Sequence, residues 1–112
     1  MQIIDSLKMA DDLMPFVLSG EKCITIRVGT RQAAGPYLVI ESADSNSQYP
    51  SIRVKISSIE HHQFIDIPNG DIWDDGAADH EEMFVALQRF YPDILPYSEM
   101  TVIRWENPFG LV

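Results

Sequence analysis

The chain reads Gly20-Glu21-Lys22-Cys23-Ile24-Thr25-Ile26-Arg27 where a short predicted helix gives way to a predicted strand. Side chains alternate between the two faces of a strand, so Ile24 and Ile26 should face the core. Cys23, Thr25 and Arg27 should then face a cavity or solvent. A lysine beside a hydroxyl can activate a nucleophile, and an arginine can hold a carbonyl, phosphate or carboxylate. The same pattern is also typical of a half-buried strand with a solvated outer face.

The rest of the sequence predicts alternating short strands and two short helices. We expect strands at residues 23–28, 37–41, 52–56 and 100–105, with residues 29–36 as a loop and 63–78 as irregular structure. The helices should span residues 10–19 and 81–90, with apolar stripes that include Phe16 and Phe90. This pattern predicts the α+β class, with a small open β-barrel that is mostly antiparallel and two short helices.

The composition describes one soluble domain that spans residues 1–112. Apolar residues make up 46% of the chain, and no apolar run approaches the length of a membrane span. The N-terminus lacks the basic start and long apolar run of a signal peptide. A single cysteine cannot form an internal disulfide. We therefore expect a cytoplasmic protein that does not bind membranes, and a domain of this size is commonly monomeric.

The net charge of −9 limits the class of partner. An acidic surface repels the phosphate backbone at long range, which argues against avid binding of long nucleic acid. Yet Lys22, Arg27 and Arg31 are three of only eight basic residues, and they fall within ten positions. This local concentration could hold a phosphate, a polarised carbonyl or a short nucleic-acid segment.

Three stretches of the chain resemble the ASCH domains (activating-signal-cointegrator homology), which share a barrel with the PUA RNA-binding domains. The family pattern is a helix ending in Gly-x-Lys followed by a strand Thr-x-Arg, which residues 20–27 match. A second pattern is similar to Ile67-Pro68, Asp75-Gly76 and the helix that ends at Tyr91-Pro92, and a third to the closing strand 100–106. The resemblance covers nearly the whole chain in order, as a single ASCH-like domain.

This resemblance implies an activity. Small bacterial ASCH proteins are amidohydrolases that convert N4-acetylcytidine to cytidine and acetate with a lysine, a threonine and a glutamate. By position, Lys22 and Thr25 match the first two. The glutamate is replaced by Asp75, with Asp74 as its rival, and aspartate is one methylene shorter. Thr25 would be the nucleophile, Lys22 the base, and Asp75 would orient the lysine or contact the cytosine edge.

We expect substrate binding from the residues around these three. Arg27 and the backbone N–H groups of the loop from Gly29 to Gly35 are candidates for binding the oxyanion or the base. Arg31 and Asp74 are further candidates for substrate binding, and Trp73 could stack on a base as a lid. Trp73 could instead plug one end of the barrel. The expected partner is a small-molecule nucleoside, and the resemblance also leaves short or structured RNA open.

Other functions remain open from the sequence. One is an RNA- or nucleotide-binding module without chemistry, with a ribonuclease as its variant. Another is a protein-interaction domain whose acidic surface meets a basic partner. Cys23 could be a nucleophile, but a lone cysteine is more often a small buried hydrophobe. His61 and His62 are adjacent and should point to opposite strand faces, so we predict neither a metal nor a cofactor.

Overall fold

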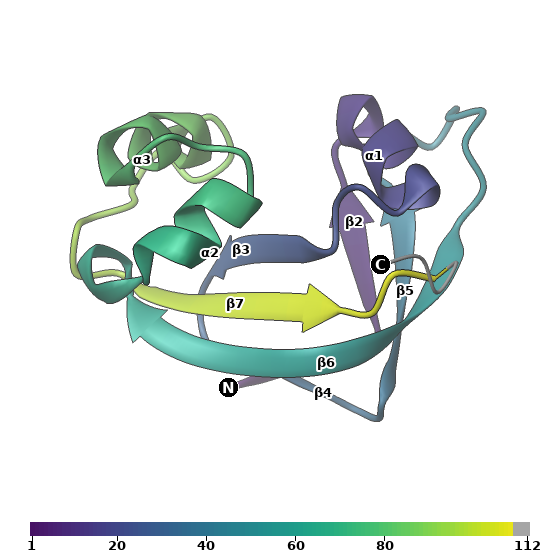
Figure 1. The fold of residues 1–112 in the computed structure, drawn as a ribbon, viewed down its shortest axis with the longest axis horizontal. Helices are drawn as coiled ribbons and strands as arrows, with labels where there is room; N and C mark the ends of the chain where they lie inside the picture. Colours follow the sequence, from purple (N-terminus) through teal and green to yellow (C-terminus); the bar gives the residue numbers. More distant parts are fainter. Residues whose placement is uncertain (109–112) are drawn as a thin grey trace.

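The structure, a computed structural model, describes residues 1–108 (Figure 1). Its strands are β1 (Gln2–Ile4), β2 (Ser6–Met9), β3 (Ile24–Val28), β4 (Arg31–Ala33), β5 (Tyr37–Ser42), β6 (Ile52–Gln63) and β7 (Glu99–Trp105). Its helices are α1 (Met14–Ser19), α2 (Asn69–Asp74) and α3 (His80–Gln88), with 3-10 turns η1 (Asp11–Leu13) and η2 (Phe64–Asp66). None of these helices is long and apolar enough to cross a membrane.

The strands form two open sheets, so the predicted barrel is wrong, although the α+β class holds. Five strands lie in the order β2-β5-β6-β7-β3, and β1 pairs with β4 in a separate two-stranded sheet. Within residues 1–108, the edge strands β2 and β3 share no backbone ladder. A side chain spans the gap instead, because Arg27 of β3 donates from Nη2 to the carbonyl of Lys8 in β2 at 2.8 Å.

Several elements differ from the sequence prediction. The N-terminal strands β1 and β2 were not expected, and β4 lies in the segment that we predicted as a loop. Both β1–β4 and β2–β5 are parallel pairs, whereas the other three pairs are antiparallel. Helix α2 forms in the stretch predicted to be irregular. Its Ile72 is completely buried, which shows that packing stabilises a helix that the local sequence does not favour.

Two clusters of buried side chains hold the fold together. One packs the inner side of β3 and β7 against α2 and α3, and the other packs β2, β5 and β7 against α1. In Figure 1, α1 lies near the β2 and β5 end of the sheet, and α2 and α3 lie at the opposite end. Strand β7 contributes to both clusters, since Met100 and Val102 join the first and Ile103 and Trp105 join the second.

Candidate active site

A cavity of about 700 Å³ opens between the two groups of helices. Its walls come from the end of β2, from η1 and α1, from the middle of β3, from the turn after α2, and from α3 with the residues that follow it. The volume falls in the range of small-molecule sites, roughly 300–1,000 Å³. The cavity lies at the gap between β2 and β3, where the sheet is left open.

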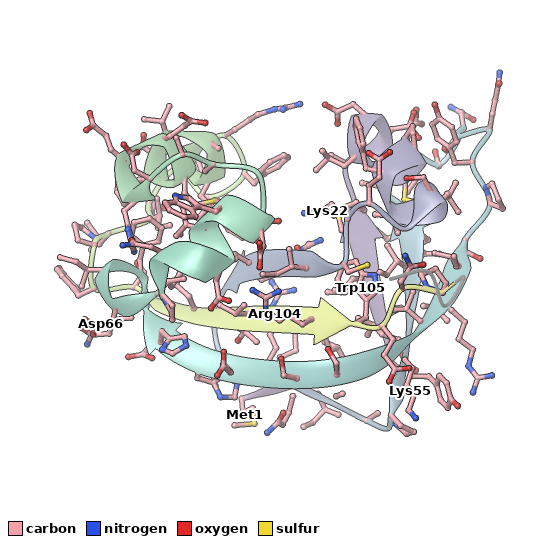
Figure 2. The ribbon with its side chains drawn as sticks, viewed as in Figure 1. Met1, Lys22, Lys55, Asp66, Arg104 and Trp105 are labelled. Atoms are coloured by element: carbon pink, nitrogen blue, oxygen red, sulfur yellow. The ribbon has the colours of Figure 1, made fainter. Side chains whose placement is uncertain are left out.

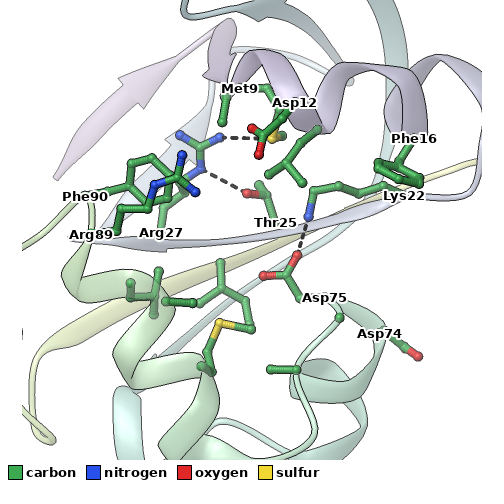
Figure 3. A pocket seen from close by; sticks show the side chains of 18 of the residues that line it. Met9, Asp12, Phe16, Lys22, Thr25, Arg27, Asp74, Asp75, Arg89 and Phe90 are labelled. Carbon is green, nitrogen blue, oxygen red and sulfur yellow. Dashed lines mark hydrogen bonds and ion pairs between the residues drawn. The ribbon is translucent and has the colours of Figure 1, made fainter.

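Lys22 and Asp75 form an ion pair inside this cavity (Figure 3). The lysine follows Gly20, which ends α1 in the left-handed conformation at φ 84°, and the amide of Lys22 donates back to the carbonyl of Phe16 at 2.9 Å. Asp75 caps the C-terminus of α2. The two side chains are 12% and 10% exposed, so this pair is largely withdrawn from water.

Thr25 lies next to this pair on β3 and is only 4% exposed. Its Oγ1 accepts a hydrogen bond from Nε of Arg27 at 2.9 Å (Figure 3). Because a guanidinium can only donate, the hydroxyl proton of Thr25 must point to another acceptor. Ile24 and Ile26 are buried, as the strand alternation predicts.

Burial sets the protonation tendencies of two of these groups. It raises the pKa of Asp75 above its ordinary value, and the Lys22 ammonium offsets only part of that effect. Burial also lowers the pKa of Arg27, which the phenol of Tyr91 partly counteracts. The neutral, protonated form of the Asp75 carboxyl is therefore more stable here than it would be on the protein surface.

The structure brings five of the predicted site residues to the cavity, namely Lys22, Thr25, Arg27, Asp74 and Asp75. Only Asp75 of the two candidate aspartates reaches the lysine. The Asp74 carboxylate, 57% exposed, pairs with Arg104 at 2.8 Å and points away from Lys22 in Figure 3.

Trp73 and Arg31 do not line the cavity. Trp73 is 66% exposed, and its indole Nε1 donates to the carbonyl of Ala78 at 2.7 Å, so it neither covers the site nor plugs the sheet. Arg31, the first residue of β4, donates from Nη2 to the carbonyl of Val28 at 3.3 Å. Both residues are therefore removed from the set that could touch a ligand in this cavity.

Two aromatic residues at the cavity were missed because the sequence assigned them to buried helix stripes. Phe16 and Phe90 line the cavity from α1 and from the turn after α3, yet they are 48% and 52% exposed. Helix α1 has only six residues, and Met14 and Val17 already fill its buried face. Exposed aromatic rings beside a cavity are suited to stacking on a planar ligand. Figure 3 shows them on opposite sides of the cavity.

Cys23 is a poor candidate for a nucleophile. Its Sγ donates to the carbonyl of Gly20 at 3.3 Å, and its side chain packs against the cluster that includes α1. Burial raises the pKa of this thiol, which disfavours the reactive thiolate.

Fold and site together define an α+β domain whose open sheet presents a lysine, a threonine and an aspartate in one small-molecule cavity. No protein-family model matches the sequence, and no curated protein matches it. Among solved structures, the chain is similar to the crystal structure of protein EF3133 from Enterococcus faecalis V583, of the family DUF984. The TM-score is 0.61 with 15% identity, covering 95% of this chain and 80% of that one, and this likeness establishes the fold alone.

Proposed function

We propose that this protein is an ASCH-type amidohydrolase that converts N4-acetylcytidine to cytidine and acetate. The observation that carries the proposal is that Asp75 lines the same cavity as Lys22 and Thr25, although the family resemblance selects it from a distant part of the chain. Lys22 and Asp75 are 53 residues apart in sequence and form a largely buried ion pair. Charged side chains that meet by chance on a protein surface stay exposed to solvent, whereas both side chains of this pair are largely buried.

The reaction would begin with a proton shift within the pair. When the substrate excludes water, an uncharged pair becomes more favourable than two buried charges, so Lys22 Nζ passes a proton to Asp75 Oδ1. The raised pKa of Asp75 favours this direction. Lys22 then has a free lone pair and accepts the hydroxyl proton of Thr25, acting as the general base.

Thr25 Oγ1 would attack the acetyl carbonyl as its proton leaves. The new Oγ1–C bond gives a tetrahedral intermediate, and the positive charge of Arg27 beside Oγ1 stabilises its oxyanion. Collapse breaks the C–N4 bond, and Lys22 returns the proton to the departing nitrogen to release cytidine. Water then attacks the acetyl ester of Thr25 while Lys22 takes a proton from it, and Lys22 passes this proton to Oγ1 as the Oγ1–C bond breaks. The acetic acid released gives up its proton to solvent as acetate, and the proton on Asp75 returns to Lys22 to restore the ion pair.

The shape of the cavity supports a free nucleoside as substrate. Its volume of about 700 Å³ suits a nucleoside, and the exposed rings of Phe16 and Phe90 offer stacking surfaces for the pyrimidine. The net charge of −9 favours an uncharged nucleoside over a phosphate-rich polymer.

The test is incubation of the purified protein with N4-acetylcytidine, with cytidine release followed by chromatography. We expect turnover by the wild type, a loss of about 10²- to 10⁴-fold in Lys22→Ala, and no turnover in Thr25→Ala, which lacks the nucleophile. Thr25→Ser keeps a hydroxyl and should retain activity.

Lys55→Ala is the matched control, because Lys55 is an exposed lysine on β6 far from Lys22 (Figure 2). It should leave cytidine release unchanged. Absence of release by the wild type at high protein concentration would rule out this substrate. Full activity in Thr25→Ala would rule out the nucleophile.

A further inference from the structure

A second cluster of chemically active side chains lies outside the cavity, between β6 and α2. One ligand atom each from Glu60, His62 and Asp71 lies within 4.8 Å of the other two. Glu60 and His62 stand two positions apart on β6, so both point to the same face of the sheet. Asp71 comes from α2, which packs over that part of the sheet. None of the three lines the cavity.

Asp71 is the reason to regard this cluster as a binding site. It is 7% exposed, and its Oδ1 accepts a hydrogen bond from Arg104 at 2.5 Å. Its other oxygen, Oδ2, is buried and has no hydrogen-bond partner among the described residues. A buried carboxylate oxygen without a partner is costly, and a bound cation would satisfy it.

His62 presents a second buried atom of this kind. Its Nε2 has no hydrogen-bond partner within residues 1–108, and the nearest carboxylate oxygen of Glu60 is 3.9 Å away. The neighbouring His61 points to the other side of the strand, where its Nε2 lies 2.7 Å from the carbonyl of Arg31. Only one of the two adjacent histidines is therefore available to this cluster.

We propose that Glu60, His62 and Asp71 bind one divalent transition-metal ion. An imidazole nitrogen with two carboxylate oxygens is a ligand set that suits Zn²⁺, with water completing the tetrahedron. Metal–ligand bonds of about 2.0–2.2 Å in a tetrahedron place the ligand atoms about 3.4 Å apart, so atoms that now lie up to 4.8 Å apart must draw together. Glu60 can supply this movement, since its side chain is 52% exposed.

Arg104 gives the site its supporting contact. Its Nη2 donates to both Asp71 and Asp74, and it rises from β7 beneath α2 (Figure 2). This holds the Asp71 carboxylate with Oδ1 occupied and leaves Oδ2 for the ion, as outer partners of metal ligands commonly do. The ion would fasten α2 to β6, and α2 ends at Asp75. We therefore expect the bound ion to stabilise the packing of α2 on β6.

The test is calorimetric titration of the chelator-treated full chain with Zn²⁺, together with thermal unfolding with and without Zn²⁺. We expect one ion per chain and a higher melting temperature with Zn²⁺. His62→Ala should weaken binding by at least about tenfold, and Asp71→Asn by a similar factor. Asp71→Asn also loses the charge that faces Arg104, so His62→Ala, at a half-buried position of β6, is the decisive variant.

His61→Ala is the matched control, since it removes the adjacent histidine on the opposite face, and it should bind Zn²⁺ like the wild type. Absence of saturable binding by the wild type would overturn the site. Equal losses in His61→Ala and His62→Ala would also overturn it, because they would show nonspecific binding by surface histidines.

Discussion

At the scale of single residues, the arrangement of Arg27 changes the role that its sequence position suggests. The strand pattern makes it a candidate for holding substrate. In the structure its Nε is engaged by Thr25 and its Nη2 by the carbonyl of Lys8. It therefore acts first as a positioning residue, which fixes the Thr25 hydroxyl and ties β3 to β2.

Asp75 provides a prediction about the pH dependence of stability. Burial raises its pKa in the folded protein above the ordinary value of 3.8, so the folded state holds this proton more tightly than the unfolded state. Stability contributed by Asp75 is thus lost as the pH rises from 3.8 through the raised pKa. Asp75→Asn cannot ionise and should lack this loss.

The measurement is urea unfolding of both proteins from below pH 3.8 to neutral pH. The free energy of unfolding of the wild type, minus that of Asp75→Asn, should fall as the pH increases. A difference that rises with pH would mean that the ion pair with Lys22 outweighs burial, and it would contradict the direction of the shift.

At the scale of elements, the end of α1 depends on a glycine. Gly20 has φ 84°, and a Cβ there would lie 2.6 Å from Oδ1 of Asn107. Gly20→Ala should therefore add backbone strain of about 1–2 kcal/mol and force the Asn107 amide to move, and both effects should lower the free energy of unfolding. Because Lys22 follows two residues later, its side chain should also be displaced.

Alanine substitutions at two other glycines distinguish the effect of backbone strain from the effect of the contact with Asn107. Gly29 has φ 98°, and a Cβ added there would meet no atom within 4 Å, so Gly29→Ala carries the strain alone. Gly35 has neither feature, so Gly35→Ala should be nearly neutral. Chemical denaturation should give the order Gly20→Ala, Gly29→Ala, Gly35→Ala from most to least destabilised. Equal stability of all three variants would refute the account.

The elements also show what the sequence could predict. The strands with clear apolar alternation, β3, β5, the first part of β6 and β7, and helix α3 lie near their predicted positions, although β6 runs on to Gln63. β1, β2 and β4 have only three or four residues each and depend on parallel partners distant in sequence, so local pattern carries little signal for them. Pro68-Asn69-Gly70 reads as a turn, and only the burial of Ile72 shows why α2 forms there.

In the candidate site, too, local sequence could predict some residues, and only the packing of the folded chain shows the others. Lys22, Thr25 and Arg27 share one short segment, so strand alternation and the family resemblance could select them together. The choice between Asp74 and Asp75 needed the geometry at the end of α2. The exposure of Phe16 could not be predicted, because it depends on how a six-residue helix is rotated against the sheet.

At the scale of the whole molecule, the net negative charge and the size of the cavity predict that the protein binds a nucleoside in preference to RNA. In Thr25→Ala, which cannot turn over substrate, N4-acetylcytidine at about 100 times its dissociation constant should raise the free energy of unfolding by about 2.7 kcal/mol. Single-stranded RNA should give no such stabilisation at near-physiological salt, because the net charge is −9.

Thermal or chemical unfolding with each ligand measures this difference, and cytidine serves as the product control. Stabilisation by RNA and none by the nucleoside would reverse the assignment. The protein would then be better described as an RNA-binding module.

The position of β7 has a consequence for biosynthesis. This strand pairs with both β3 and β6 and contributes to both hydrophobic clusters, yet it is the last of the described elements to leave the ribosome. Until then the nascent chain has no strand between β3 and β6, and both hydrophobic clusters lack the residues that β7 contributes. The domain can therefore complete its folding only after β7 has emerged, and the incomplete chain exposes apolar surface that chaperones bind.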